Sequence, residues 1–219
     1  MLALFSINFL FEVTTFLYRF NFSLFRCMME PIGKEEHAVV LDFLPNGYPF
    51  DTRPSHLKTP IVQAIGKNHF VILELVPKKD VSLQPHQEVY IGDGKREHIH
   101  HINGRIPSSK LTRTAKAELE FVIKKMVKDN QGKFIDFFNR APPLSTRMHS
   151  LELLPGLGKK RMWEILEERK GDPFKDFDDL KSRVKLIPDP EVLITRRIQQ
   201  ELTGMEKHHL FVQRAELRV

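Results

Sequence analysis

A short run in the second half of the chain, Pro155-Gly156-Leu157-Gly158, has the composition of a backbone turn that binds anions. Its two glycines allow positive φ values and leave no side chains between the backbone N–H groups and a ligand. Apolar residues at helical spacing on both sides predict a helix, a tight turn and a second helix, whose N-terminal dipole attracts an anion. Lys159, Lys160 and Arg161 follow directly and supply the mobile positive charge that suits polynucleotide phosphates.

The apolar positions around this turn are Leu151, Leu154, Met162, Ile165 and Leu166. Together with Pro-Gly-hydrophobic-Gly they resemble the helix-hairpin-helix family, which binds DNA or RNA phosphates through hairpin amides without reading the base sequence. The resemblance implies that Gly156, Leu157 and Gly158 present amides to a strand, with Lys159 and Lys160 as auxiliary contacts. Two alternatives remain open, a plain helical hairpin with a glycine C-cap and a hairpin that contacts a protein.

The net charge of +6 is concentrated beside this motif, because residues 108–150 hold nine Lys and Arg against four Asp and Glu. Apolar residues from Leu111 to Val127 recur at helical spacing, so residues 108–130 are predicted to form a basic amphipathic connecting helix with a Ser or Thr cap. Lys110, Arg113 and Lys116 on its polar face are predicted contacts to nucleic acid. The alternative is that these cations form only a solvated helix face.

Residues 36–107 read as about five short strands separated by turns such as Pro45-Asn46-Gly47 and Gly66-Lys67-Asn68. The pattern predicts a small OB-like β-barrel, with an SH3-like barrel as the alternative. Barrels of this kind bind single strands through basic and aromatic side chains. The candidates for that role are Tyr48, Phe50, Arg53, Lys67, Tyr90, Lys95, Arg96 and Arg105.

Residues 131–204 are predicted to form an all-α helix-hairpin-helix domain, which makes the fold class α+β. A helix starting at Phe134 should stop at Pro142-Pro143, and Pro143 or Ser145 should open the first helix of the hairpin. A second helical pair over 174–202 lacks the glycines and reads as a structural partner of the first. Residues 205–219 are predicted to be a loose polar tail.

Residues 1–29 form a Phe-rich extension that we expect to lie outside the fold, with Met28 or Met29 as the expected start of the working protein. Its charged Glu12 and Arg19 argue against a membrane anchor or a signal peptide. The single Cys27 excludes a disulfide framework and indicates a cytoplasmic protein.

Three clusters could support catalysis, and each has a simpler explanation. His98 and His100 would face one side of a strand and His101 the other, so at most two could share a metal. The acidic residues near 176–179 could hold magnesium in a nuclease, but they also suit the first turn of a helix. The Gly92-Asp93-Gly94 turn lacks the spacing of a phosphate-binding Walker loop. We therefore expect no catalytic residues, no metal and no cofactor.

The order of barrel, basic helix and hairpin, with Val-Leu-Asp-Phe-Leu-Pro-Asn-Gly-Tyr at residues 40–48, resembles a family of uncharacterised archaeal proteins. That family is described as nucleic-acid- or nucleotide-binding, with an OB-like domain joined to a helix-hairpin-helix domain, and the resemblance covers residues 36–204. The resemblance supplies no reaction. From the residues named above, we expect a non-enzymatic protein that binds RNA or DNA, with RNA favoured and with the ribosome or RNA-processing proteins as partners. The alternatives are a protein-interaction module of a translation or repair assembly and a metal-dependent nuclease.

Overall fold

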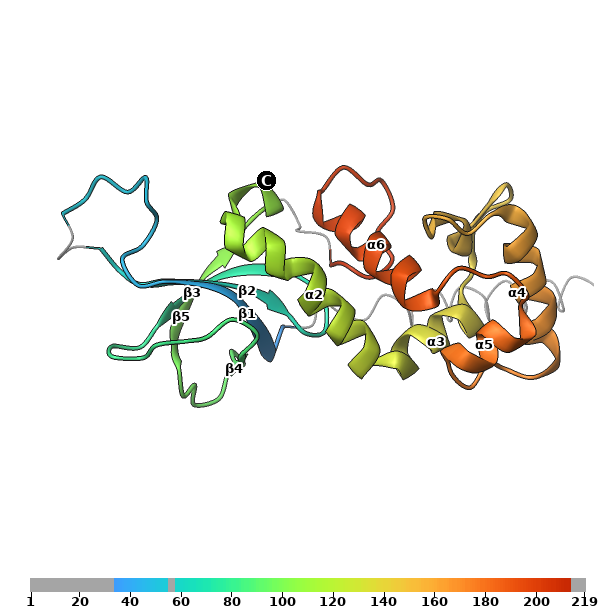
Figure 1. Cartoon of the computed structure of the whole chain (residues 1–219), viewed down its shortest axis with the longest axis horizontal. Helices are drawn as coiled ribbons and strands as arrows, with labels where there is room; N and C mark the ends of the chain where they lie inside the picture. The colour runs from blue at the N-terminus through green and yellow to red at the C-terminus, as the bar shows by residue number, and fades with distance from the viewer. Residues whose placement is uncertain (1–33, 55–57, 214–219) are drawn as a thin grey trace, which may run out of the picture. The chain divides into compact units, whose positions relative to one another are not determined.

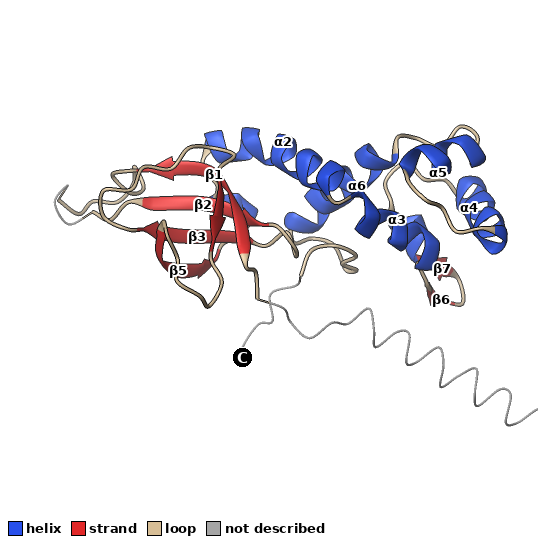
Figure 2. Cartoon of the chain, turned by 90° about the horizontal axis from the view of Figure 1, so that it is seen from below, coloured by secondary structure: helices blue, strands red, loops and turns tan. Residues whose placement is uncertain are grey.

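Five strands in the first half of the chain form a single antiparallel sheet (Figures 1 and 2). The strands are β1 (His37–Leu44), β2 (Ile61–Gly66), β3 (Ile72–Pro77), β4 (Glu88–Tyr90) and β5 (Ile99–Arg105). The computed structural model describes residues 34–54 and 58–213, so the Phe-rich extension at 1–29 and the end of the chain from 214 lie outside the described residues.

The strand order in the sheet is β4-β1-β2-β3-β5, which makes β4 and β5 the two edges. The sheet curls into a half-barrel, and within the described residues these two edge strands are not paired with each other. The Gly66-Lys67-Asn68 turn joins β2 to β3 as predicted, with Ile65 opposite Ile72. A bulge in β1 between Val40 and Asp42 shifts the register against β2 and redirects the side chains that follow.

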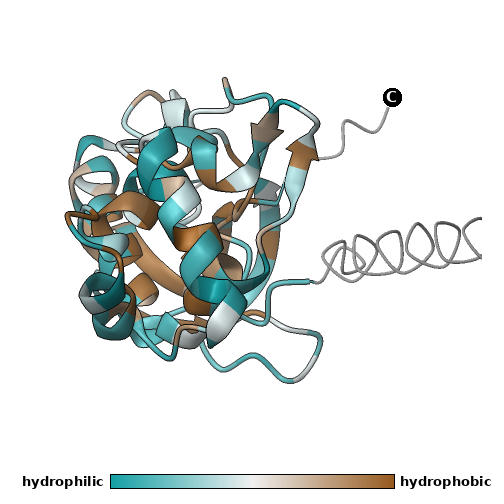
Figure 3. Cartoon of the chain, turned by 90° about the vertical axis from the view of Figure 1, so that its right-hand side faces the viewer, coloured by the Kyte–Doolittle hydropathy of each residue, from teal (hydrophilic) through white to brown (hydrophobic). Residues whose placement is uncertain are grey.

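Apolar side chains cover both faces of the sheet. The inner face of the curl carries a cluster that includes Val40, Ala64 and Leu75. The other face carries Val39 and Ile72, which belong to a larger cluster shared with the helices. In Figure 3 the helices that face the viewer carry both hydrophobic and hydrophilic segments, as amphipathic helices packed on a core do.

Helix α2 (Arg113–Asp129) packs against β1 and follows the short 3₁₀ helix η2 (Ser108–Lys110). Thr112 caps α2 because its side chain accepts a hydrogen bond from the backbone N–H of Ala115. Helix α3 (Gln131–Arg140) begins directly after Asn130, so the predicted break between the two helices is confined to one residue. Among the described residues, no helix is long and apolar enough to cross a membrane.

The prediction of a helix opening at Pro143 or Ser145 is wrong. These residues form β6 (Pro143–Ser145), which pairs with β7 (Met148–His149) in a small two-stranded sheet. Two consecutive prolines lack the N–H groups that a helix needs, and a residue before proline favours extended backbone. Between Pro143 and the glycine turn, the structure has only one helical segment, the 3₁₀ helix η3 (Ser150–Leu153).

Three helices complete the chain: α4 (Lys159–Gly171), α5 (Phe177–Arg183) and α6 (Pro190–Leu202). Buried side chains from all three join the cluster on the outer face of the sheet, among them Ile165, Phe177 and Ile198. Continuous apolar packing therefore extends from β1 to α6.

The expectation of a loose tail is wrong for residues 205–213. Phe211 packs edge-on against Phe134 and Phe137 of α3, with ring centroids 5.5 and 5.0 Å apart. The backbone N–H groups of residues 210, 211 and 212 donate hydrogen bonds to the buried carboxylate of Glu201. The composition of this segment does not predict its packing, because the carboxylate that holds it belongs to Glu201 of α6.

Candidate functional site

The turn between η3 and α4 has the hydrogen bond and the residue types of a type II β-turn. The backbone N–H of Leu157 donates to the carbonyl of Leu154 at 3.1 Å, with Pro155 and Gly156 at the two central positions. Gly156 has a φ of +94°, which the second central position of this turn requires and which glycine adopts without strain. Local backbone geometry therefore fixes the conformation of this turn.

Leu157 holds this turn in place and does not offer its backbone N–H group to a ligand. Its side chain is buried together with those of Leu151 and Leu154, and its amide is already used to close the turn. The implication that Leu157 offers its amide to a strand is therefore wrong. Gly156 and Gly158 on either side are exposed, so a ligand could approach the backbone at the glycines but not at the leucine.

The N-terminus of α4 has no side-chain cap, because Gly158 occupies the N-cap position. The first N–H groups of a helix have no intrahelical acceptor, so those of Lys159, Lys160 and Arg161 remain available. Lys159 and Lys160 are exposed, and within the described residues their ammonium groups make no ion pair. Arg161 differs, since its guanidinium lies 2.6 Å from the Glu164 carboxylate.

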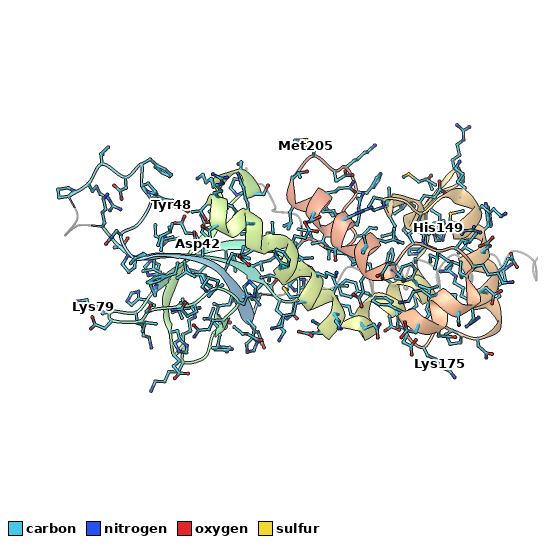
Figure 4. The ribbon with its side chains drawn as sticks, in the orientation of Figure 1. Asp42, Tyr48, Lys79, His149, Lys175 and Met205 are labelled. Carbon is cyan, nitrogen blue, oxygen red and sulfur yellow. The ribbon has the colours of Figure 1, made fainter. Side chains whose placement is uncertain are left out.

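A second group of predicted residues meets where the loop after β1 approaches the start of α2. The fully buried Gln63 connects them, donating from Nε2 to the Tyr48 hydroxyl and to the carbonyl of Lys110, both at 3.1 Å. Its Oε1 accepts from the backbone N–H of Thr112 at 2.9 Å. The bulge in β1 directs Asp42 to the same place, where its carboxylate accepts from the Thr112 hydroxyl at 2.6 Å. Asp42 and Tyr48 are labelled in Figure 4.

Tyr48 supports an exposed aromatic neighbour. Its hydroxyl donates to Glu74 at 2.6 Å, and burial together with this hydrogen bond raises the pKa of Tyr48 to about 12. The ring of Phe50 stacks on that of Tyr48, with centroids 4.9 Å apart and planes 14° apart, while Phe50 remains 78% exposed. Tyr48 therefore holds Phe50 in a fixed orientation at the surface.

Arg53, in the same loop, is already paired. Its guanidinium makes a two-pronged contact with Asp51, at 2.7 Å for the shortest pair. The same contact holds the pKa of Asp51 at about 2 and raises the pKa of Arg53. Arg53 is exposed and Asp51 is partly buried, so a phosphate would have to compete with this pair for Arg53.

The remaining predicted contacts do not form one site. Lys67 is paired with Glu88 at 2.8 Å, and the Tyr90 hydroxyl accepts from the backbone N–H of Gly94 at 3.1 Å. Lys110, Arg113 and Lys116 are exposed at the start of α2, and within the described residues their side chains make no ion pair. Lys95 and Arg96 lie in the loop between β4 and β5, where Arg96 Nε donates to the carbonyl of Gly92 at 2.9 Å. Arg105 donates to the side chain of Gln213 at 2.8 Å.

The acidic cluster predicted for a nuclease has structural partners. Asp176 is the N-cap of α5 and accepts from the backbone N–H of Asp179 at 2.7 Å, whereas Asp178 pairs with Lys181 at 2.9 Å. His100 and His101 contact each other, with 2.7 Å between their Nδ1 atoms. In the part of the chain that the structure describes, no group of three His, Cys, Asp or Glu side chains could hold a metal ion.

Two residues of interest were absent from the predicted contacts. Gln63 gives no local signal, because its importance comes from three distant partners. Trp163, by contrast, could have been found by helical periodicity, since it lies off the apolar stripe of Met162 and Ile165 and is 60% exposed.

These features define a mixed α/β protein with a curled antiparallel half-barrel sheet and an exposed glycine turn at a helix N-terminus. Residues 34–213 match the family described as "Protein of unknown function (DUF655)", and the chain belongs to that family. The resemblance to a family of uncharacterised archaeal proteins is thereby confirmed.

Two relatives extend this assignment. The chain is 42% identical over 185 residues to uncharacterized protein MJ0038 of Methanocaldococcus jannaschii. The aligned residues cover 84% of this chain and 82% of that protein. It is also similar to the crystal structure of Af1531 from Archaeoglobus fulgidus, a DUF655 protein, with 44% identity and a TM-score of 0.76. That comparison covers 82% of this chain and 100% of the other, so the similarity includes both the sheet and the helices.

Proposed function

We propose that this protein binds nucleic acid without catalysing a reaction and without reading base sequence. The observation that carries the proposal is the uncapped N-terminus of α4, with exposed Gly156 and Gly158 beside it. Free N–H groups at a helix N-terminus bind phosphate, and nearby lysines add long-range attraction. In this proposal η3, the turn and α4 act as a helix-hairpin-helix unit whose first helix is reduced to a single 3₁₀ segment.

The half-barrel sheet provides a second contact in this proposal. In this proposal the sheet acts as an OB-fold opened between β4 and β5, which the strand order β4-β1-β2-β3-β5 supports, and OB-folds bind oligonucleotides through the loops that follow the first and fourth strands. Here these loops carry the Tyr48–Phe50 stack and the basic pair Lys95 and Arg96. Phe50 would stack on a base, while Lys110, Arg113 and Lys116 would attract the backbone.

A salt titration tests the proposal directly. Fluorescence anisotropy of labelled RNA and DNA strands, mixed with the full chain at increasing salt, should show affinity that falls steeply and log-linearly, because counterions are released on binding. Parallel RNA and DNA arms decide which polymer is preferred. Absence of binding at low salt would remove the proposal and leave the protein-interaction alternative.

A matched pair of substitutions tests the role of the α4 amides. Gly158 has no atom within 4 Å of an added Cβ, so Gly158→Asp should fold and cap the helix with its carboxylate. The added charge and the occupied amides should weaken strand binding by about tenfold or more. Gly132→Asp is the control, because Gly132 is equally open and lies in the first turn of α3. Equal losses in the two variants would show that the α4 amides have no special role.

The nuclease alternative has its own readout. Incubation of the same strands with magnesium should leave them intact if the protein only binds. Magnesium-dependent cleavage that is lost in Asp178→Asn would replace the proposed function with catalysis.

A further inference from the structure

A groove of about 580 Å³ runs along α4 beside the segment that follows α5. One wall carries Trp163, which is the single tryptophan of the chain and is 60% exposed. Burial of an aromatic ring of this size is strongly favourable. A ligand that covers the exposed Trp163 ring would therefore gain this free energy on binding. The groove is separate from the apolar stripe by which α4 packs on the core.

The charges around this groove leave two cations free. Its acidic members each have an internal partner: Glu164 pairs with Arg161 at 2.6 Å, Glu167 with Lys170 at 2.7 Å and Glu168 with Arg183 at 3.3 Å. Lys160 and Lys185, which also line the groove, make no ion pair within the described residues. A ligand in the groove would therefore meet an aromatic face and two available ammonium groups.

The sequence positions place this aromatic face close to the start of α4. Trp163 follows Lys160 by three residues, so both lie on the same side of the helix. The N-cap Gly158 is five residues before Trp163, or roughly 7 Å along the helix axis. A strand held near the start of α4 would therefore bring its next base to the tryptophan.

We infer that this groove binds an unpaired nucleobase, which stacks on the indole of Trp163 while flanking phosphates contact Lys160 and Lys185. The inference rests on the proposed function and adds a specificity to it, because a base stacked in a duplex cannot also stack on the indole. The protein should therefore prefer single-stranded segments over duplexes of the same length. Sequence tolerance is retained, since every base has a π-face.

Intrinsic fluorescence of the full chain reports on this site directly, because Trp163 has no other tryptophan to obscure it. Oligouridylate and oligodeoxythymidylate should quench the emission, and the quenching should saturate together with the anisotropy of the labelled strand. Duplexes and inorganic phosphate should quench far less. Equal quenching by inorganic phosphate, or strand binding without quenching, would overturn the inference.

Trp163→Ala should weaken single-strand binding by about tenfold and leave duplex binding nearly unchanged, because stacking on one base is lost. Trp163→Phe should recover most of the affinity, since a phenyl ring still stacks. The matched control is Phe121→Ala, which truncates another exposed aromatic side chain, 66% exposed on α2.

The outcomes separate the two proposals. If Trp163→Ala binds single strands as tightly as the parent chain, base stacking on Trp163 is excluded and phosphate binding stands. If the parent chain binds no strand at low salt, both the proposed function and this inference are overturned.

Discussion

At the scale of single residues, the glycine turn divides its tasks between neighbours. Leu157 uses its side chain for the core and its amide for the turn, whereas Gly156 and Gly158 keep the backbone open to solvent. Arg161 and Lys160 differ in the same way, because only Arg161 has an acidic partner one turn away. Adjacent residues of one motif therefore have opposite roles, and substitutions in it should be interpreted one position at a time.

His149 shows how a single buried group can make stability depend on pH. Its Nδ1 accepts from the backbone N–H of Leu151 at 3.1 Å, which requires an unprotonated nitrogen. Burial, with Arg169 nearby, lowers the pKa of His149 below its ordinary value. Protonation is therefore easier in the unfolded chain, and the stabilisation is lost as pH falls below the unfolded pKa of about 6.5.

We expect the free energy of unfolding of the parent chain to fall more between about pH 7 and about pH 5 than that of His149→Asn, which keeps a short hydrogen-bonding side chain but does not titrate. Urea denaturation at several pH values measures the difference. Parallel pH profiles for the two proteins would contradict the role assigned to His149.

At the scale of elements, the bulge in β1 and the amide of Gln63 fix where α2 begins. The bulge directs Asp42 to the Thr112 hydroxyl, while Gln63 bonds the backbone on both sides of Leu111. The same amide contacts Tyr48, on which Phe50 stacks. Strand, loop and helix are therefore coupled through one buried side chain.

Gln63→Met should destabilise the fold by about 2 kcal/mol, because it leaves buried backbone groups of Lys110 and Thr112 without their partner. Chemical denaturation measures this loss, and the exposed Gln84→Met should change stability by less than about 0.5 kcal/mol. Equal stability of the two variants would mean that water or a shifted helix start replaces the Gln63 contacts.

At the scale of the whole molecule, a buried ion pair connects α6 to the segment that follows it. Arg197 and Glu201 are 3% and 1% exposed, and their charged groups lie 2.8 Å apart. Glu201 also accepts from three backbone amides of residues 210–212, and the backbone N–H of Gln213 then reaches the carbonyl of His69 at 3.1 Å. The last described residues thus connect α6 to the turn between β2 and β3.

Glu201→Ala should cost about 3 kcal/mol, because it removes the closer carboxylate partner of the buried Arg197, which keeps Glu206 at 3.2 Å, and leaves three backbone N–H groups without their acceptor. It should also release residues 210–212, which hydrogen exchange would detect as faster exchange of their amides. Glu167→Ala breaks an exposed pair and should cost about 1 kcal/mol or less. Retained protection at residues 210–212 in Glu201→Ala would mean that Phe211 packing alone holds the segment.

Patterns within a few residues predicted much of the secondary structure. The β2–β3 hairpin and helix α2 were predicted from turn residues and apolar spacing. The region from Pro143 to His149 was predicted wrongly as helix because proline and serine suit a helix start, whereas the observed hairpin also requires β6 and β7 to pair with each other.

The candidate site also has features that the sequence predicted and features that it did not. The sequence by itself determined that a tight turn would precede a basic helix. The signals are apolar periodicity, the positions of glycine and proline, and the run of cations, and they depend on residues close together in the chain. Only the tertiary structure decided that the Leu157 side chain packs into the core, that Trp163 faces a groove and that Gln63 joins three elements. Those properties depend on contacts between residues far apart in the chain, which no local preference specifies.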